Sequence, residues 1–386
     1  MKGKNISIAF MCNNIDPSAG GTERVTRYVA DRLKDIGYKC NYIYSNIDDK
    51  EIVENRKIKI EQFGDKKYLT ESLHRFVMKN QIKVLIVVNQ IYQTPKYQAV
   101  FKELKIKTEI KIIACLHAAP DNWKKDDKIS LVLPKIFIKS RLKRWLCYFY
   151  NRNAQKSVGM YYLADKFLLL SDRYIPTFSK TFHIDDTTEH KLVAIPNPCP
   201  FTNSYNGERR GNVVLIVSRM AEIQKRIFFA LKVWRNIVNS TKEWKLIIVG
   251  DGPQLRNYKQ YVIRHRLDNV HFVGHSNKVS EFYKTSKIFL MTSVWEGQPM
   301  SVIEAMHFGC VPVVVDSFEA IHDLVEDGKN GVLTKNNDFD DMCNKLSNLL
   351  SNEAQYSDSI LNNTNELFVE DTIIHKWDVL LKSLMR

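Results

Sequence analysis

Two carboxylates, Glu296 and Glu304, stand eight residues apart at a predicted junction between a strand and a helix. The apolar run 288–291 predicts the strand, Gly297 lies in the turn, and Ser301 occupies the N-cap or first turn of the helix. Backbone N–H groups in such a turn lie at the positive end of the helix dipole, where a phosphate group binds well. The stretch therefore indicates a site for a phosphate ester. The alternative is a turn of any α/β protein with two solvated glutamates.

Two cations follow another predicted strand. Arg219 comes directly after the apolar run 212–218, and Lys225 precedes a predicted helix over 227–238. A pair of this kind can neutralise a leaving diphosphate, the arginine by bidentate contact and the lysine as a point charge. Two solvated surface cations are the alternative interpretation.

Two further candidates lie in the first half of the chain, each after a predicted strand. Gly20 and Gly21 follow the strand 6–11, and a backbone without side chains can approach a ligand closely. A tight turn between a strand and a helix would also need glycine for its own geometry. His117 follows the strand 111–116, at the strand end where ligands of parallel sheets bind. A hydrogen-bonded loop histidine is the alternative there.

Strands and helices alternate along the chain, which predicts parallel, doubly wound sheets. At 386 residues the chain is too long for one core, so two domains are expected. Proline, asparagine and glycine cluster around residues 196–211 and indicate a linker. The remaining predicted strands are 40–44, 58–63, 84–88, 163–171, 193–195, 244–250, 270–274 and 311–315, and the remaining predicted helices are 69–79, 97–105, 279–285 and a last one from 371.

The glutamate spacing, with E-G before it and G-x-P-V-V after it, resembles the E-x7-E signature of the family 4 glycosyltransferases. These are retaining enzymes of the GT-B superfamily, among them bacterial polysaccharide and glycolipid glycosyltransferases. Arg219 and Lys225 match the family's R-x5-K pattern, residues 20–24 match its G-G-x-E/x-R stretch, and 250–253 match its G-x-G-P turn. The resemblance covers nearly the whole chain, and its most specific motifs lie in the second half.

The resemblance implies an α/β GT-B fold of two facing doubly wound Rossmann-like domains. It implies an acceptor-side domain over 1–198, a linker over 199–211 and a nucleotide-sugar domain over 212–370. A helix over 371–386 is expected to return to the first domain.

The resemblance also implies a role for each candidate residue. Arg219 and Lys225 would hold the diphosphate, while Glu296 and His117 would contact the donor sugar. Glu304 would hold the ribose hydroxyls. The residues expected to bind the nucleotide and its diphosphate are Gly20, Gly21, Gly252, Gly297, Met300, Ser301 and Glu304.

The sequence departs from the family pattern at two places. A glycine or asparagine commonly follows the lysine of R-x5-K, whereas this chain has Arg226, so the shape of that loop is open. After Val315 the family has two glycines and then a glutamate. This chain has D-S-F-E-A-I-H-D without the glycines, so no contact is carried over for that loop.

The resemblance implies a retaining transfer of a sugar from a nucleotide-sugar, with UDP as the expected nucleotide, to a saccharide or lipid-linked acceptor. The product would belong to a cell-surface polysaccharide or glycolipid. A nucleotide-sugar 2-epimerase of the same shape is the main alternative, and a basic membrane- or RNA-binding protein is another. No cofactor is expected. Asp338–Asp340 resembles a metal-binding D-x-D, but its place before a helix favours N-capping, so no required metal is predicted.

The formal net charge of +14 indicates an anionic partner. Residues 134–156 carry seven Lys/Arg and no acid, interleaved with aromatic side chains. Such a segment suits the surface of an anionic membrane, here through 135–156, although a buried helix with one cationic face would read the same. No nucleic-acid motif accompanies it, so no nucleic-acid partner is expected.

The remaining composition indicates a cytoplasmic protein, bound at most peripherally to the inner face of the cell membrane. No apolar run approaches the roughly 18–20 residues of a membrane span, and the run 6–11 is too short for a signal peptide. The seven cysteines are scattered without a C-x-x-C pair, which predicts reduced thiols and neither disulfides nor zinc ligands.

Overall fold

The computed structural model describes most of the chain as two compact units. The described residues are 6–16, 20–45, 57–60, 65–88, 90–122, 152–187, 189–201, 210–237, 243–352 and 370–385. The first unit contains those up to Pro200 together with those from Glu370 onward, and the second contains those between Phe201 and Asn352. Each unit is described by itself below.

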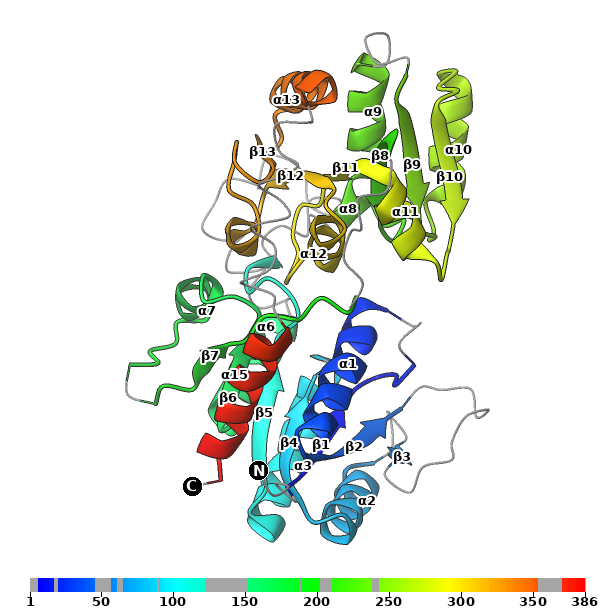
Figure 1. Ribbon diagram of the computed structural model, residues 1–386. Helices are drawn as coiled ribbons and strands as arrows, with labels where there is room; N and C mark the ends of the chain where they lie inside the picture. The colour runs from blue at the N-terminus through cyan, green and yellow to red at the C-terminus, as the bar shows by residue number, and fades with distance from the viewer. Residues whose placement is uncertain are drawn as a thin grey trace. The chain divides into compact units, whose positions relative to one another are not determined.

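The described residues of the first unit form a sheet of seven parallel strands with helices packed around it (Figure 1). The strands are β1 (Ser7–Met11), β2 (Lys39–Tyr44), β3 (Lys57–Lys59), β4 (Ile82–Val87), β5 (Lys111–Cys115), β6 (Lys166–Leu169) and β7 (Leu192–Ala194). The helices are α1 (Gly21–Asp35), α2 (Lys66–Lys79), α3 (Pro95–Thr108), α6 (Arg152–Leu163), α7 (Tyr174–Phe182) and α15 (Glu370–Ser383). The strand order is β3-β2-β1-β4-β5-β6-β7.

The described residues of the second unit form a sheet of six parallel strands, in the order β10-β9-β8-β11-β12-β13. These strands are β8 (Gly211–Val217), β9 (Lys245–Val249), β10 (Val270–Gly274), β11 (Ser286–Met291), β12 (Val311–Asp316) and β13 (Val332–Lys335). The helices are α8 (Glu222–Lys225), α9 (Ile227–Ile237), α10 (Leu255–Arg264), α11 (Val279–Thr285), α12 (Met300–His307) and α13 (Phe339–Asn352).

Both sheets are doubly wound, and each reverses its strand order beside its first strand. β1 pairs with β2 on one side and β4 on the other, and β8 pairs with β9 and β11 in the same way. The central strands are apolar because helices bury them on both faces. In such sheets ligands bind at the carboxyl ends of the strands, where the order reverses. The predicted α/β GT-B fold is confirmed.

The last helix, α15, belongs to the first unit and packs against α1, as Figure 1 shows. Trp377 is 7% exposed and Leu381 is fully buried. The Tyr38 hydroxyl donates a hydrogen bond of 2.7 Å to the Asp378 carboxylate, and Glu370 accepts from the Tyr28 hydroxyl. The predicted return of the last helix to the first domain is therefore confirmed.

The structure shortens two predicted strands. β6 begins only at Lys166 because α6 continues to Leu163, and β3 ends at Lys59, with residues 61–64 outside the described part of the chain. The predicted N-cap of α13 is confirmed, since the Asp338 carboxylate accepts a hydrogen bond of 2.9 Å from the Asp341 N–H.

Three other expectations can be compared with the structure only where residues are described. The basic segment 135–156 lies outside them up to 151, and the side chains of 152–156 at the start of α6 are not described either. The described cysteines all carry free thiols, as predicted. Within the described ranges, no helix combines the length and apolarity needed to cross a membrane.

Candidate active site

Two loops of the second unit meet at the carboxyl ends of β8 and β11. One loop runs from Ser218 to Arg226 and the other from Thr292 to Pro299, and they are adjacent because their strands pair. The Val294 N–H donates a hydrogen bond of 2.8 Å to the Gln224 carbonyl. The Thr292 hydroxyl donates one of 2.8 Å to the Lys225 carbonyl. One backbone hydrogen bond and one bond from a side-chain hydroxyl to a backbone carbonyl therefore join the two loops.

The first of these loops contains a helical turn that the sequence analysis did not predict. α8 covers only four residues and ends at Arg226, whose N–H donates to the Glu222 carbonyl at 3.0 Å. Arg226 has left-handed backbone angles, φ 48° and ψ 47°, which cost a non-glycine residue about 1–2 kcal/mol. A glycine or asparagine adopts this conformation easily. The open question about the loop is therefore answered: its helical turn ends in an arginine with left-handed backbone angles.

Three of the predicted site residues lie together across the two loops. The Lys225 ammonium forms an ion pair with the Glu296 carboxylate, and their side chains are 16% and 12% exposed. The Arg219 guanidinium donates a hydrogen bond of 3.2 Å to the Gln224 amide oxygen. The Gln224 amide nitrogen donates to the Trp295 carbonyl at 3.0 Å and to the Glu296 carboxylate at 3.4 Å. Two cations and one carboxylate leave the group with an excess positive charge, which favours an anionic ligand.

Gln224 is the member of this group that sequence reasoning missed. It connects Arg219 to Glu296, although 72 residues separate it from that glutamate. Its only sequence signal is its place immediately before the lysine of R-x5-K. A glutamine carries no charge and belongs to no motif, so its contacts emerge only once the two loops are adjacent.

The start of α12 lies in the same loop as Glu296. Pro299 is the N-cap residue and no side chain caps the helix, and Ser301 lies in the first turn as predicted. The Met300 N–H donates to the Gln298 carbonyl at 3.0 Å, so the loop itself already engages this expected donor. Gly297 is buried within the loop. The helix start therefore offers a ligand fewer of its N–H groups than the sequence suggested.

Glu304 lies deeper in the same helix and is 2% exposed. Its carboxylate accepts a hydrogen bond of 2.9 Å from the Tyr283 hydroxyl, and the Tyr283 ring stacks on Phe308 with 6.0 Å between centroids. A buried carboxylate needs such hydrogen bonds to stay stable. The contact fixes the direction of this side chain, while its expected bond to a ribose stays a prediction.

Gly252 has a packing reason to be glycine. Its φ is +150°, and a Cβ atom there would lie 2.9 Å from the Met220 nitrogen and 3.0 Å from the Met220 oxygen. The Met220 N–H also donates a hydrogen bond of 2.8 Å to the Asp251 carbonyl. The turn at 250–253 thus packs against the loop that carries Arg219. The backbone of Gly252 lies so close to Met220 that a side chain would not fit there.

The other predicted residues, Gly20, Gly21 and His117, belong to the first unit. Gly20 is the N-cap of α1, and a Cβ atom on Gly21 would meet no atom within 4 Å. His117 follows β5 and is partly exposed. Desolvation lowers the pKa of His117 to about 4, so its ring is neutral at pH 7. The open space at Gly21 means that packing within the unit does not require glycine at this position.

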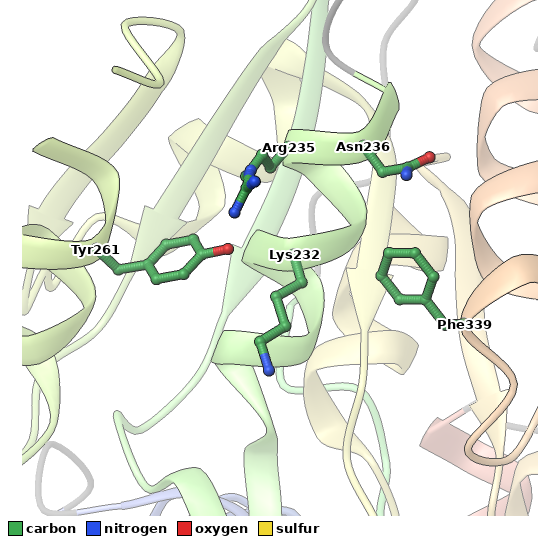
Figure 2. A pocket seen from close by; sticks show the side chains of 5 residues that line it. All are labelled: Lys232, Arg235, Asn236, Tyr261 and Phe339. Carbon is green, nitrogen blue, oxygen red and sulfur yellow. The ribbon is translucent and has the colours of Figure 1, made fainter. Parts of the chain in front are cut away.

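A separate hollow of about 350 Å³ lies on the surface of the second unit (Figure 2). Lys232, Arg235 and Asn236 of α9 line it together with Tyr261 and Phe339. Lys225 ends α8, whereas Lys232, Arg235 and Asn236 belong to the following helix, α9. None of the predicted site residues lines this hollow, so it is distinct from the group around Lys225.

Comparison with known proteins identifies the class of the protein. Residues 203–366 match the model of the family described as glycosyl transferases group 1, and this segment contains the Arg219, Lys225 and Glu296 group. Over 97% of its length the chain is 27% identical to an uncharacterized glycosyltransferase of Haemophilus influenzae, of which it covers 99%. The chain is a glycosyltransferase. The predicted enzyme class and family resemblance are thereby confirmed.

Two further matches of this glycosyltransferase carry more informative names. One is an alpha-1,4-N-acetyl-D-galactosaminyltransferase of Campylobacter jejuni, named for an acceptor linked through PP to undecaprenol. It is 25% identical over 50% of the chain and 54% of its own length. The other is the structure of the pneumococcal O-GlcNAc transferase GtfA in complex with UDP and GlcNAc. It superposes with a TM-score of 0.75 at 13% identity, covering 100% of both chains, and shows the shared fold.

Proposed function

We propose that the glycosyltransferase moves a sugar from a UDP-sugar to a saccharide or lipid-linked acceptor, with retention of the anomeric configuration. The product would be a bacterial cell-surface polysaccharide or glycolipid. The name of the Campylobacter jejuni relative supports a lipid-linked acceptor, and the bound UDP of the pneumococcal structure supports the nucleotide. The observation that carries the proposal is the joining of Arg219, Lys225 and Glu296 at the carboxyl ends of β8 and β11.

Each side chain of this group has a proposed task. Lys225 and Arg219 hold the donor diphosphate and stabilise the charge that develops on it as the sugar leaves. Glu296, released from Lys225, accepts hydrogen bonds from the hydroxyls of the donor sugar. Gly297 and Ser301 at the start of α12 complete the diphosphate site, and Glu304 holds the ribose. Catalysis is then chiefly electrostatic and positional.

The proposed reaction balances without a nucleophile from the enzyme. The bond between the anomeric carbon and the diphosphate oxygen breaks, and the acceptor oxygen bonds to the same carbon from the same face. The acceptor proton moves to the leaving phosphate oxygen. In this scheme the two cations neutralise the diphosphate, so no metal or other cofactor is required.

The first unit supplies the remaining proposed contacts. A Cβ atom on Gly21 would meet no atom within 4 Å, and this open space supports close approach of a substrate group to the backbone there. His117 is neutral at pH 7 because burial lowers its pKa to about 4, so it can exchange hydrogen bonds with a sugar hydroxyl. Segment 135–156 and the net charge of +14 support peripheral binding to an anionic membrane.

Replacing Lys225 by alanine tests the proposal. With a panel of UDP-sugars and a lipid-linked acceptor, we expect Lys225→Ala to lower kcat/KM about 100- to 1,000-fold, because one preorganised charge contact to the leaving group is lost. Lys232→Ala removes a lysine of the surface hollow and is the matched control, with turnover unchanged. NMR of the product assigns its anomeric configuration. Full turnover by Lys225→Ala, or an inverted product, would overturn the proposal.

A further inference from the structure

Arg226 occupies a position where its backbone conformation would suit a glycine, yet its side chain makes specific contacts. The Nε atom donates a hydrogen bond of 2.9 Å to the Thr292 carbonyl at the end of β11. The Nη1 atom donates one of 2.5 Å to the Asn337 side chain, just before α13. The guanidinium also lies over the Phe229 ring, 5.1 Å from its centroid. One side chain therefore joins the α8 turn to three other segments of the second unit.

This arrangement is unfavourable in two respects. The residue adopts left-handed backbone angles, and its Nη2 atom is buried without a hydrogen-bond partner among the described residues. The same burial lowers the pKa of the Arg226 guanidinium. Features of this kind persist where the surrounding structure imposes them, and they gather at functional sites.

The contacts of Arg226 act directly on the turn that carries Lys225. Arg226 and Thr292 bond reciprocally, because the Thr292 hydroxyl donates to the Lys225 carbonyl at 2.8 Å and to the Arg226 carbonyl at 3.1 Å. At the other end of the turn, the Glu222 carboxylate accepts from the Phe228 N–H at 3.1 Å. The hydrogen bonds of Thr292 therefore tie the C-terminal end of the turn to the loop that contains Glu296.

We propose that Arg226 is a positioning residue for the donor diphosphate. By tying the α8 turn to Thr292 and Asn337, it holds the Lys225 ammonium where the charge of the leaving group develops. The inference rests on the proposed function of Lys225. A displacement of about 1 Å at a catalytic group lowers a rate about 100-fold, so loosening this turn acts mainly on kcat.

A double-mutant cycle tests whether Arg226 acts through Lys225. Arg226→Gly suits the left-handed backbone but removes the ties, and we expect kcat with the UDP-sugar that the wild-type enzyme uses to fall about 10- to 100-fold. In a Lys225→Ala background the same change is expected to lower kcat less than threefold. Arg226→Lys keeps a donor near Thr292 and is expected to recover part of kcat. Arg235→Gln, at the surface hollow of the same unit, is the matched control with kcat unchanged.

The outcomes separate this inference from the proposed function. If Lys225→Ala keeps full turnover, the proposed function fails. If Lys225→Ala is impaired but Arg226→Gly keeps full kcat, or lowers it equally in both backgrounds, only the positioning role fails. Asn337→Gly removes one tie without altering position 226, and glycine suits its φ of 60°. Should Arg226→Gly fail to fold, a loss of kcat in Asn337→Gly that disappears in the Lys225→Ala background supports the inference, and unchanged kcat overturns it.

Discussion

The Lys225 ammonium and the Glu296 carboxylate form an ion pair. With side chains 16% and 12% exposed, they are largely withdrawn from water. In the proposed roles Lys225 binds the diphosphate and Glu296 binds the sugar hydroxyls, so a donor that engages both groups competes with this ion pair. Part of the binding free energy of the donor is therefore used to break this ion pair. UDP alone also has to break it, but UDP makes no compensating contact between a sugar and Glu296.

This exchange predicts opposite effects of one substitution on binding and on turnover. Glu296→Gln frees Lys225 for the diphosphate, so we expect UDP to bind about 3- to 10-fold more tightly in calorimetry while sugar transfer falls. Glu326→Gln breaks the exposed pair with Lys329 in the same unit and serves as the control, with both quantities unchanged. Weaker UDP binding by Glu296→Gln would show that the pair supports the nucleotide site instead of competing with it.

His117 predicts a pH dependence of stability. Its pKa in the folded protein, about 4, lies below the usual value of 6.5, so the unfolded chain binds the proton more tightly. The neutral ring thus stabilises the fold above pH 6.5, and this contribution is lost as the pH falls toward 4. Its upper limit is about 3 kcal/mol, and partial exposure of the ring makes the real change smaller.

Urea unfolding of the wild type and of His117→Gln between pH 4 and pH 7 measures this contribution. Glutamine stays neutral throughout, so the variant should lose less free energy of unfolding than the wild type as the pH is lowered. Parallel pH profiles for the two proteins would mean that His117 is solvated in the folded state.

At the scale of elements, the sequence patterns predicted most of the described strands and helices, because apolar periodicity and glycine signals are local. They did not predict α8, α10 or β13. The misses at the site have tertiary causes. α8 has only four residues, too few for a periodic pattern, and its end depends on Arg226 adopting a left-handed conformation that the residue type does not favour. Gln224 and Tyr283 acquire their roles through partners far away in the chain, Glu296 and Glu304. Residue types alone carry no signal for such contacts.

The packing of α15 predicts where the first unit is most sensitive. Trp377 is 7% exposed on this helix, and replacing it by alanine should lower the free energy of unfolding by about 3–5 kcal/mol, through lost burial and the remaining cavity. Val379 on the same helix is 52% exposed, so Val379→Ala should change stability by less than about 0.5 kcal/mol. Chemical denaturation followed by circular dichroism compares the two. Equal effects would mean that α15 does not pack on α1 in solution.

At the scale of the whole molecule, the two units have separate cores but differ in how their chain is arranged. The described residues of the second unit come from one continuous stretch, whereas the first unit needs α15 from beyond that stretch. A unit that lacks one of its packed helices exposes apolar surface and loses stability.

This difference predicts the behaviour of fragments. Residues 201–369 alone should unfold cooperatively, as seen by circular dichroism. Residues 1–200 alone should be less stable by several kcal/mol, and a peptide of residues 370–386 added in trans should restore them. Full stability of 1–200 without the peptide would contradict the assignment of α15 to this unit. A scrambled peptide of the same composition is the control.

The position of α15 also determines when the first unit can be completed during translation. About 170 residues separate Pro200 from the helix that completes the first unit. At roughly 5–20 residues per second, a ribosome takes on the order of ten to thirty seconds to make them. The first unit therefore lacks its final helix while the second unit is still being translated. During that interval the face of α1 that α15 later covers is exposed and available to a chaperone.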